Sequence, residues 1–132
     1  MINQFKKVSI VLAFAALQSC AASPQQAAKL AHLRATVPSC VGAEACKIKW
    51  EAAEIWIADN AGYSLRLVTD SVLETYRGDA YSTIISAKVV KRPAGGDRYT
   101  IEATVNCNNI FGCVPDVWTA AQNFNDTLNK LN

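Results

Sequence analysis

Histidine is nearly absent from this chain, since His32 is the only one among 132 residues. It lies in a small, polar segment near the N-terminus, where a solvated side chain is the usual outcome. A Ser–His or Cys–His catalytic pair needs a histidine inside the fold, and so does a histidine–carboxylate metal centre. The sequence therefore argues against both kinds of site.

Phosphate-binding loops and basic runs are also missing. The Gly95-Gly96 pair is not followed by the lysine and helix of a phosphate loop. The formal net charge is only +2, and no basic run is present, which argues against nucleic acid as a partner. Carboxylates alone can hydrolyse glycosides, but Asp70, Glu74 and Glu102 are expected on a wet sheet face, where the pKa of an acid stays ordinary. We therefore expect no cofactor and no metal.

The N-terminal apolar run is short. It extends from Val8 to Leu17, is interrupted only by Ser9, and follows Lys6 and Lys7. A basic segment before a short apolar run is typical of a secretory signal peptide, and the run is too short to span a bilayer as a helix. We expect removal of residues 1–19, which leaves a chain of about zero formal charge.

Residues 17–20, Leu-Gln-Ser-Cys, resemble the lipobox of bacterial lipoproteins, although Gln18 departs from the small or apolar residue that is usual there. The resemblance implies cleavage before Cys20, a diacylglycerol thioether on Cys20 and a further acyl chain, such as palmitate, on the new amino terminus. Ala21, in place of the Asp that retains Gram-negative lipoproteins in the inner membrane, implies the outer membrane and a periplasmic domain. The alternative is ordinary cleavage after Ala21 or Ala22, which yields a secreted or periplasmic soluble protein.

The remaining cysteines form two pairs of identical C-x5-C spacing. An even number of cysteines in an oxidising compartment predicts two disulfides. The spacing favours local pairing, with a crossed pairing as the second choice. A zinc site is the functional alternative, although zinc-binding cysteines usually lie two to four residues apart. The four residues are Cys40, Cys46, Cys107 and Cys113.

Hydrophobic periodicity predicts one α+β domain at residues 43–132, after a lipidated cysteine and tether at residues 20–42. The predicted order is helix, strand, strand, strand, helix, in which the first strand segment is either one strand or two joined by a kink. This order predicts a two-layer sandwich, in which two helices cover one face of an antiparallel meander of three strands, or four if kinked. The predicted elements are a helix at 44–61, strands at 63–76, 81–91 and 98–107, and a final helix from Pro115.

Two sets of apolar residues are candidate partner contacts. Trp50 and Trp56 point well apart on the first predicted helix, so the sheet covers only one of them. The other is covered by the second helix or the tether, or it forms a partner surface. Ile110 and Phe111 lie at the tip of the loop between the last two cysteines, where they either tuck under the loop or project.

These features favour a small, non-catalytic envelope lipoprotein that acts as a binding or structural module. It is expected to attach to the membrane through Cys20, and an envelope protein is a candidate partner. The alternative functions are a small hydrolase that acts on cell-wall glycan or lipid, and an inhibitor of such an enzyme. An inhibitor requires a projecting loop such as residues 108–112.

Overall fold

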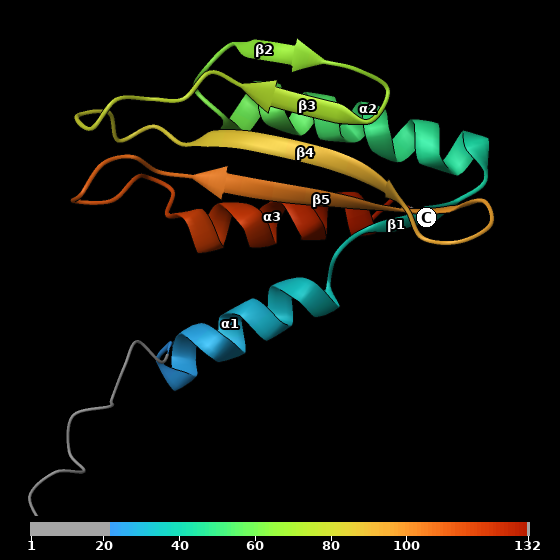
Figure 1. Cartoon of the computed structure of the whole chain (residues 1–132), viewed down its shortest axis with the longest axis horizontal. Helices are drawn as coiled ribbons and strands as arrows, with labels where there is room; N and C mark the ends of the chain where they lie inside the picture. Colours follow the sequence, from blue (N-terminus) through green and yellow to red (C-terminus); the bar gives the residue numbers. More distant parts are fainter. Residues whose placement is uncertain (1–21, 132) are drawn as a thin grey trace, which may run out of the picture.

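Five antiparallel strands form a single sheet in the computed structural model, which describes residues 22–131. The strand order is β1-β5-β4-β3-β2 (Figure 1). Strands β2 to β5 form a meander, and β1 pairs with the outer edge of β5. The signal segment and the lipobox, including Cys20, lie outside the described residues. The strands are β1 (Ser39–Val41), β2 (Leu65–Val68), β3 (Val72–Thr75), β4 (Ser86–Pro93) and β5 (Arg98–Asn106).

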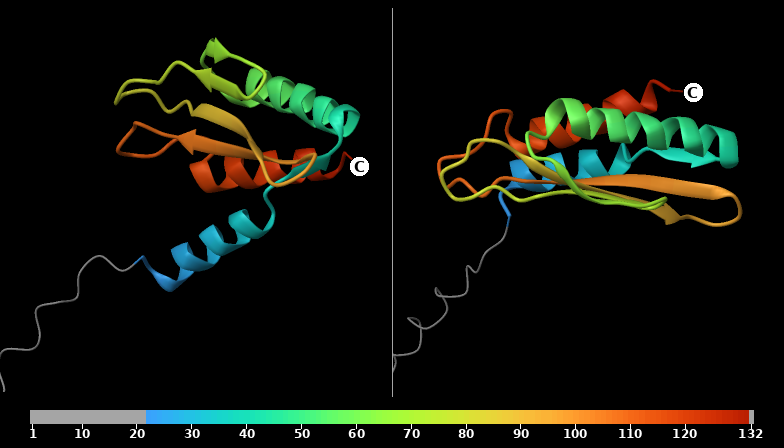
Figure 2. Two further views of the ribbon diagram at one scale, coloured as in Figure 1. Left: turned by 45° about the vertical axis from the view of Figure 1, so that its right-hand side comes forward. Right: turned by 90° about the horizontal axis from the view of Figure 1, so that it is seen from above.

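Three helices accompany the sheet: α1 (Pro24–Ala35), α2 (Ala43–Asn60) and α3 (Val117–Asn129). Helices α2 and α3 cover one face, while no described helix covers the other (Figure 2). Helix α1 lies beyond the β5 side of the sheet, next to α3. The predicted α+β class is confirmed, whereas the number and order of the elements differ from the prediction. Within residues 22–131, no helix has the length and apolar character needed to cross a bilayer.

The region expected to be a tether contains two of these elements. Helix α1 begins with a capping box, in which the Ser23 side chain accepts from the Gln26 backbone and the Gln26 side chain accepts from the Ser23 backbone. Strand β1 pairs with residues 98–100 of β5. The Ser-x-x-Gln motif is visible in the sequence, but a three-residue strand is too short to show alternation. The sheet therefore begins before residue 43.

The middle of the chain also differs from the prediction. Residues 63–76 form the kinked alternative, because the Thr69 hydroxyl accepts from the backbone N–H of Val72 at 2.9 Å and closes a hairpin between β2 and β3. The strand predicted from Tyr81 begins only at Ser86. The reason is local, since Asp79 Oδ1 accepts from the backbone N–H of Tyr81 at 2.9 Å and holds the preceding segment as a loop.

Both tryptophans of α2 are buried, so of the two outcomes considered for them the structure has the covered one, and neither offers a partner surface. Trp56 is 3% exposed and meets Phe124 of α3 edge to face at 5.2 Å between ring centroids. Its indole N–H donates to Asn123 Oδ1 at 2.7 Å. Trp50, on the other flank, is 7% exposed and lies under the amine of Lys91 at 4.9 Å. The second helix and the sheet therefore cover both tryptophans of α2, while Ile48 and Ile55 of the same helix stay 47% and 62% exposed.

Two local disulfides fasten the two ends of the domain. Cys40–Cys46 links β1 to the first turn of α2, with an S–S distance of 2.05 Å. Cys107–Cys113 closes the segment after β5, at 2.02 Å. The local pairing predicted from the C-x5-C spacing is confirmed, and the crossed pairing is wrong.

Candidate functional site

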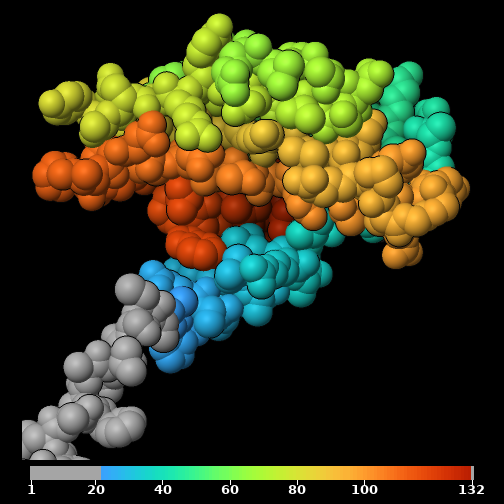
Figure 3. Space-filling model, viewed as in Figure 1, coloured from blue at the N-terminus to red at the C-terminus, as the bar shows by residue number. Residues whose placement is uncertain are grey.

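Four large apolar side chains are almost fully exposed at one end of the sheet. They lie on two loops, at residues 76–85 between β3 and β4 and at residues 107–116 between β5 and α3. Because neighbouring strands are antiparallel, the chain leaves β3 and β5 at the same end, and the two loops project there together (Figure 3). We call these side chains the loop tip: Tyr81, Ile110, Phe111 and Val114, exposed by 91%, 85%, 93% and 85%.

Hydrogen bonds join the two loops to each other. The side-chain amide of Asn108 donates to the carbonyl of Gly78, and the backbone N–H of Val114 donates to the carbonyl of Thr83 at 3.0 Å. The Cys107–Cys113 disulfide closes the second loop behind these contacts. The loop tip therefore lies on two loops that hydrogen bonds hold together. Binding through it loses little conformational entropy, because the loops are already held in place.

Local backbone geometry turns Phe111 outward. Asn109 Oδ1 accepts from the backbone N–H of Phe111 at 2.8 Å, and the Asn109 carbonyl accepts from the N–H of Gly112 at 3.1 Å. Gly112 has a φ of 96°, a left-handed conformation that favours glycine. The exposure of Phe111 therefore follows from this turn. Hydrogen bonds to Asn109 hold the turn, in place of contacts with the core.

Half of the loop tip was predicted from the sequence. Ile110 and Phe111 were candidate contacts, and of the two outcomes considered the structure has the projecting one. Tyr81 was instead expected at the start of the strand at 81–91, and Val114 received no role. The turn-forming Asp79 is the signal that places Tyr81 on a loop, while nothing in the local pattern marks Val114.

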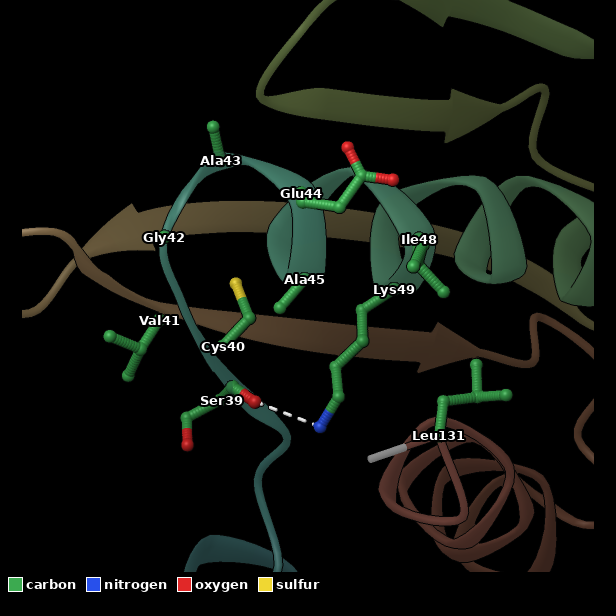
Figure 4. A pocket seen from close by; sticks show the side chains of 10 residues that line it. All are labelled: Ser39, Cys40, Val41, Gly42, Ala43, Glu44, Ala45, Ile48, Lys49 and Leu131. Atoms are coloured by element: carbon green, nitrogen blue, oxygen red, sulfur yellow. Dashed lines mark hydrogen bonds between the residues drawn. The ribbon is translucent and has the colours of Figure 1, made fainter.

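A second surface feature is an apolar groove of about 740 Å³ at the start of α2 (Figure 4). Its lining includes the exposed side chains of Val41 and Ile48, together with Leu131 beyond the end of α3. Lys49 also lines the groove, and its amine donates to the Ser39 carbonyl at 2.9 Å. The described residues that line it include no pair of carboxylates and no histidine, so the groove suits binding of apolar groups.

The three acids considered for hydrolysis are not assembled into a site. Glu74 accepts from Arg66 at 2.8 Å, and this hydrogen bond lowers the pKa of Glu74 below its ordinary value. A general acid needs the opposite shift. Glu102 is half-exposed beside Arg92, with a nitrogen–oxygen distance of 3.4 Å. Asp70 lines a hollow near α2, on the other face of the sheet from Glu74.

Metal ligands are likewise not gathered in the part of the chain that the structure describes. Within residues 22–131, no three side chains of His, Cys, Asp or Glu are grouped so that they could hold a metal ion. The four cysteines of the alternative zinc site are joined in disulfides. His32, the only histidine, is exposed on α1.

Comparison with known proteins adds no further guide to the site. Searches against protein-family models, curated proteins and solved structures find no match for this chain.

Proposed function

We propose that the chain is an envelope lipoprotein, anchored through Cys20 at the periplasmic face of the outer membrane, and that its domain is a non-catalytic binding module. The single observation that carries the binding role is the loop tip. Large apolar side chains exposed together on a soluble domain mark contact sites, whereas isolated ones do not. The anchor itself rests on the resemblance of residues 17–20 to a lipobox.

The fixed loops support this proposal. Two aromatic rings, Tyr81 and Phe111, lie more than nine-tenths exposed on two loops that hydrogen bonds join, and a disulfide closes the loop that carries Phe111. Aromatic side chains supply much of the binding energy at interfaces and lose little conformational entropy when they are already held in place. The loop tip therefore replaces Trp50 and Trp56 as the proposed contact.

The first experiment is an intact mass measurement on protein extracted from membranes, with and without reduction. The expected mass corresponds to cleavage before Cys20 plus acyl chains, and it rises by about four hydrogens when the two disulfides are reduced. An unacylated mass would overturn the anchor.

The second experiment places a photo-crosslinking amino acid at Phe111 in intact envelopes. Ile55 is the matched control, because it is an apolar residue of α2 with 62% exposure, outside the loop tip. We expect discrete crosslinked products, with a protein or with lipid, at position 111 that are missing at position 55. Equal labelling at both positions would show that the loop tip is not the contact surface.

An inhibitor is the second candidate function, favoured by one observation. The loop at residues 107–113 projects and is closed by a disulfide, as a segment that enters an enzyme cleft would require. We expect this chain to inhibit at least one wall-degrading hydrolase in a panel, and Phe111→Asp to abolish the inhibition. Failure against the whole panel would remove this candidate.

A further inference from the structure

The start of the described chain limits how far the domain can stand from its proposed anchor. Cys20 precedes Pro24, the first residue of α1, by four positions. An extended chain spans at most about 3.5 Å per residue, so the start of α1 lies within about 14 Å of the Cys20 backbone. The end of the domain that carries the start of α1 is therefore the end nearest the acyl chains.

The loop tip lies toward that same end. Figures 1 and 2 show that α1 begins on the side of the molecule from which the two loops project, while the β4–β5 hairpin and the start of α2 lie at the opposite end. A short connection at the start of α1 therefore brings the loop tip toward the membrane surface.

Polar side chains of α3 hold the far end of α1 in place. The buried amide of Asn125 donates to the Leu33 carbonyl at 3.1 Å and to the Thr36 hydroxyl at 3.0 Å. Asn129 donates to the Thr36 carbonyl at 2.8 Å. Because these bonds fix the end of α1 on the domain, the anchor holds this end of the domain near the membrane, while the domain can still tilt about the anchored residue.

The chemistry of the loop after β5 suits a bilayer interface, whereas the loop that carries Tyr81 also contains Arg77 and Asp79. The segment from Cys107 to Pro115 contains no charged residue, so moving it among headgroups strips water from no ion. Tyrosine and other apolar–polar aromatics are enriched at this depth of membranes.

We propose that the loop tip inserts into the lipid interface and forms a second membrane contact beside the acyl chains. This inference rests on the proposed anchorage at Cys20. One acylated residue leaves a domain free to tilt, whereas two separated contacts fix its orientation. The apolar groove at the start of α2 lies at the end away from the loop tip, so docking in this way directs the groove away from the membrane.

The test uses the acylated full-length product in vesicles of phosphatidylethanolamine and phosphatidylglycerol with brominated acyl chains. Phe111→Trp places a fluorophore in the loop tip, and Ile55→Trp is the control on α2. The emission of the parent protein, with its three tryptophans, is subtracted. We expect roughly twofold or greater quenching at position 111 relative to position 55, because interfacial apolar side chains enter about 5–10 Å into the boundary of headgroups and acyl chains.

A second position protects the result against a local effect of one substitution. Tyr81 lies on the other loop, and we expect Tyr81→Trp to show the same quenching. Circular dichroism checks that every variant is folded. Equal quenching at positions 111 and 55 overturns the inference. A third outcome also overturns the inference. If brominated lipid does not quench the indole at position 111, and the photo-crosslinker at that position captures a protein in envelopes, the loop tip binds a protein partner.

The mass of the same preparation separates this inference from the proposed function. An acylated protein without quenching refutes the membrane contact and leaves the lipoprotein intact. An unacylated protein refutes the anchor. The same vesicles then decide whether the loop tip contacts lipid without acyl chains. Quenching of the indole at position 111 without acyl chains supports the contact, and the absence of quenching overturns it.

Discussion

Two phenylalanines in opposite environments allow the same substitution to test the core and the loop tip together. Phe124 is 0% exposed and packs against Trp56, whereas Phe111 is 93% exposed. Truncating a buried phenylalanine to alanine costs about 3–5 kcal/mol, through lost burial and the cavity left behind. Truncating an exposed side chain usually changes the free energy of unfolding by less than about 0.5 kcal/mol. We therefore expect Phe124→Ala to be severely destabilising and Phe111→Ala to be nearly silent.

The measurement is urea unfolding of the purified protein and both variants, followed by circular dichroism. With an m-value of about 1.5 kcal/mol/M, the midpoint of Phe124→Ala should fall by about 2–3 M, while that of Phe111→Ala should move by less than about 0.3 M. A loss above about 1 kcal/mol for Phe111→Ala would mean that this ring is packed. The loop tip would then not be a contact surface, because that role requires the side chain of residue 111 to project into solvent.

Three other substitutions test separate parts of the fold. Replacing Cys107 and Cys113 together by alanine should lower the free energy of unfolding by about 2 kcal/mol, because the unfolded chain regains the entropy that the short closed loop removes. It should also expose residues 107–113 to proteases. An unchanged melting temperature and digestion pattern would contradict this prediction. Glu74 has a lowered pKa in the fold, so its stabilisation is present above its ordinary pKa of 4.5 and is lost as the pH falls through the lower folded value. Glu74→Gln should therefore reduce the acid-induced loss of stability between about pH 5 and pH 3, and identical pH profiles for parent and variant would refute it. Asn125→Ala should lower the free energy of unfolding by about 1–3 kcal/mol, since the Leu33 carbonyl at the end of α1 loses its donor. It should also accelerate amide exchange in α1 more than in α2. Equal acceleration in both helices would show that Asn125 does not hold α1 in particular.

Periodic segments were the part of the fold that the sequence predicted well. Strand β5 alternates because helices cover only one face of the sheet, and the expected strand at 98–107 matches Arg98–Asn106 closely. Helix α2 was expected at 44–61 and is found at Ala43–Asn60. Each of these patterns is repeated over many residues, so no distant contact is needed to recognise it.

Short or locally capped elements were predicted less well. Strand β1 has three residues and exists because it pairs with β5, about sixty positions later in the chain. The Ser23 capping box was readable, but the small, polar composition of the segment suggested a tether instead. The loop at residues 76–85 was mistaken for a tight turn and a longer strand, because Asp79 bonds to its own backbone in a way that alternation does not reveal.

Local chain properties by themselves determined the class of the fold, the longer elements and the pairing of the cysteines, because all three depend on spacings of a few residues. Only the tertiary structure decided which apolar side chains are covered. Trp56 is buried by a helix whose Asn123 lies 67 positions away, and the loop tip forms because Asn108 meets Gly78 across 30 positions. Burial depends on which distant segments meet, and an apolar residue has the same appearance in the sequence whether it faces a partner helix or water.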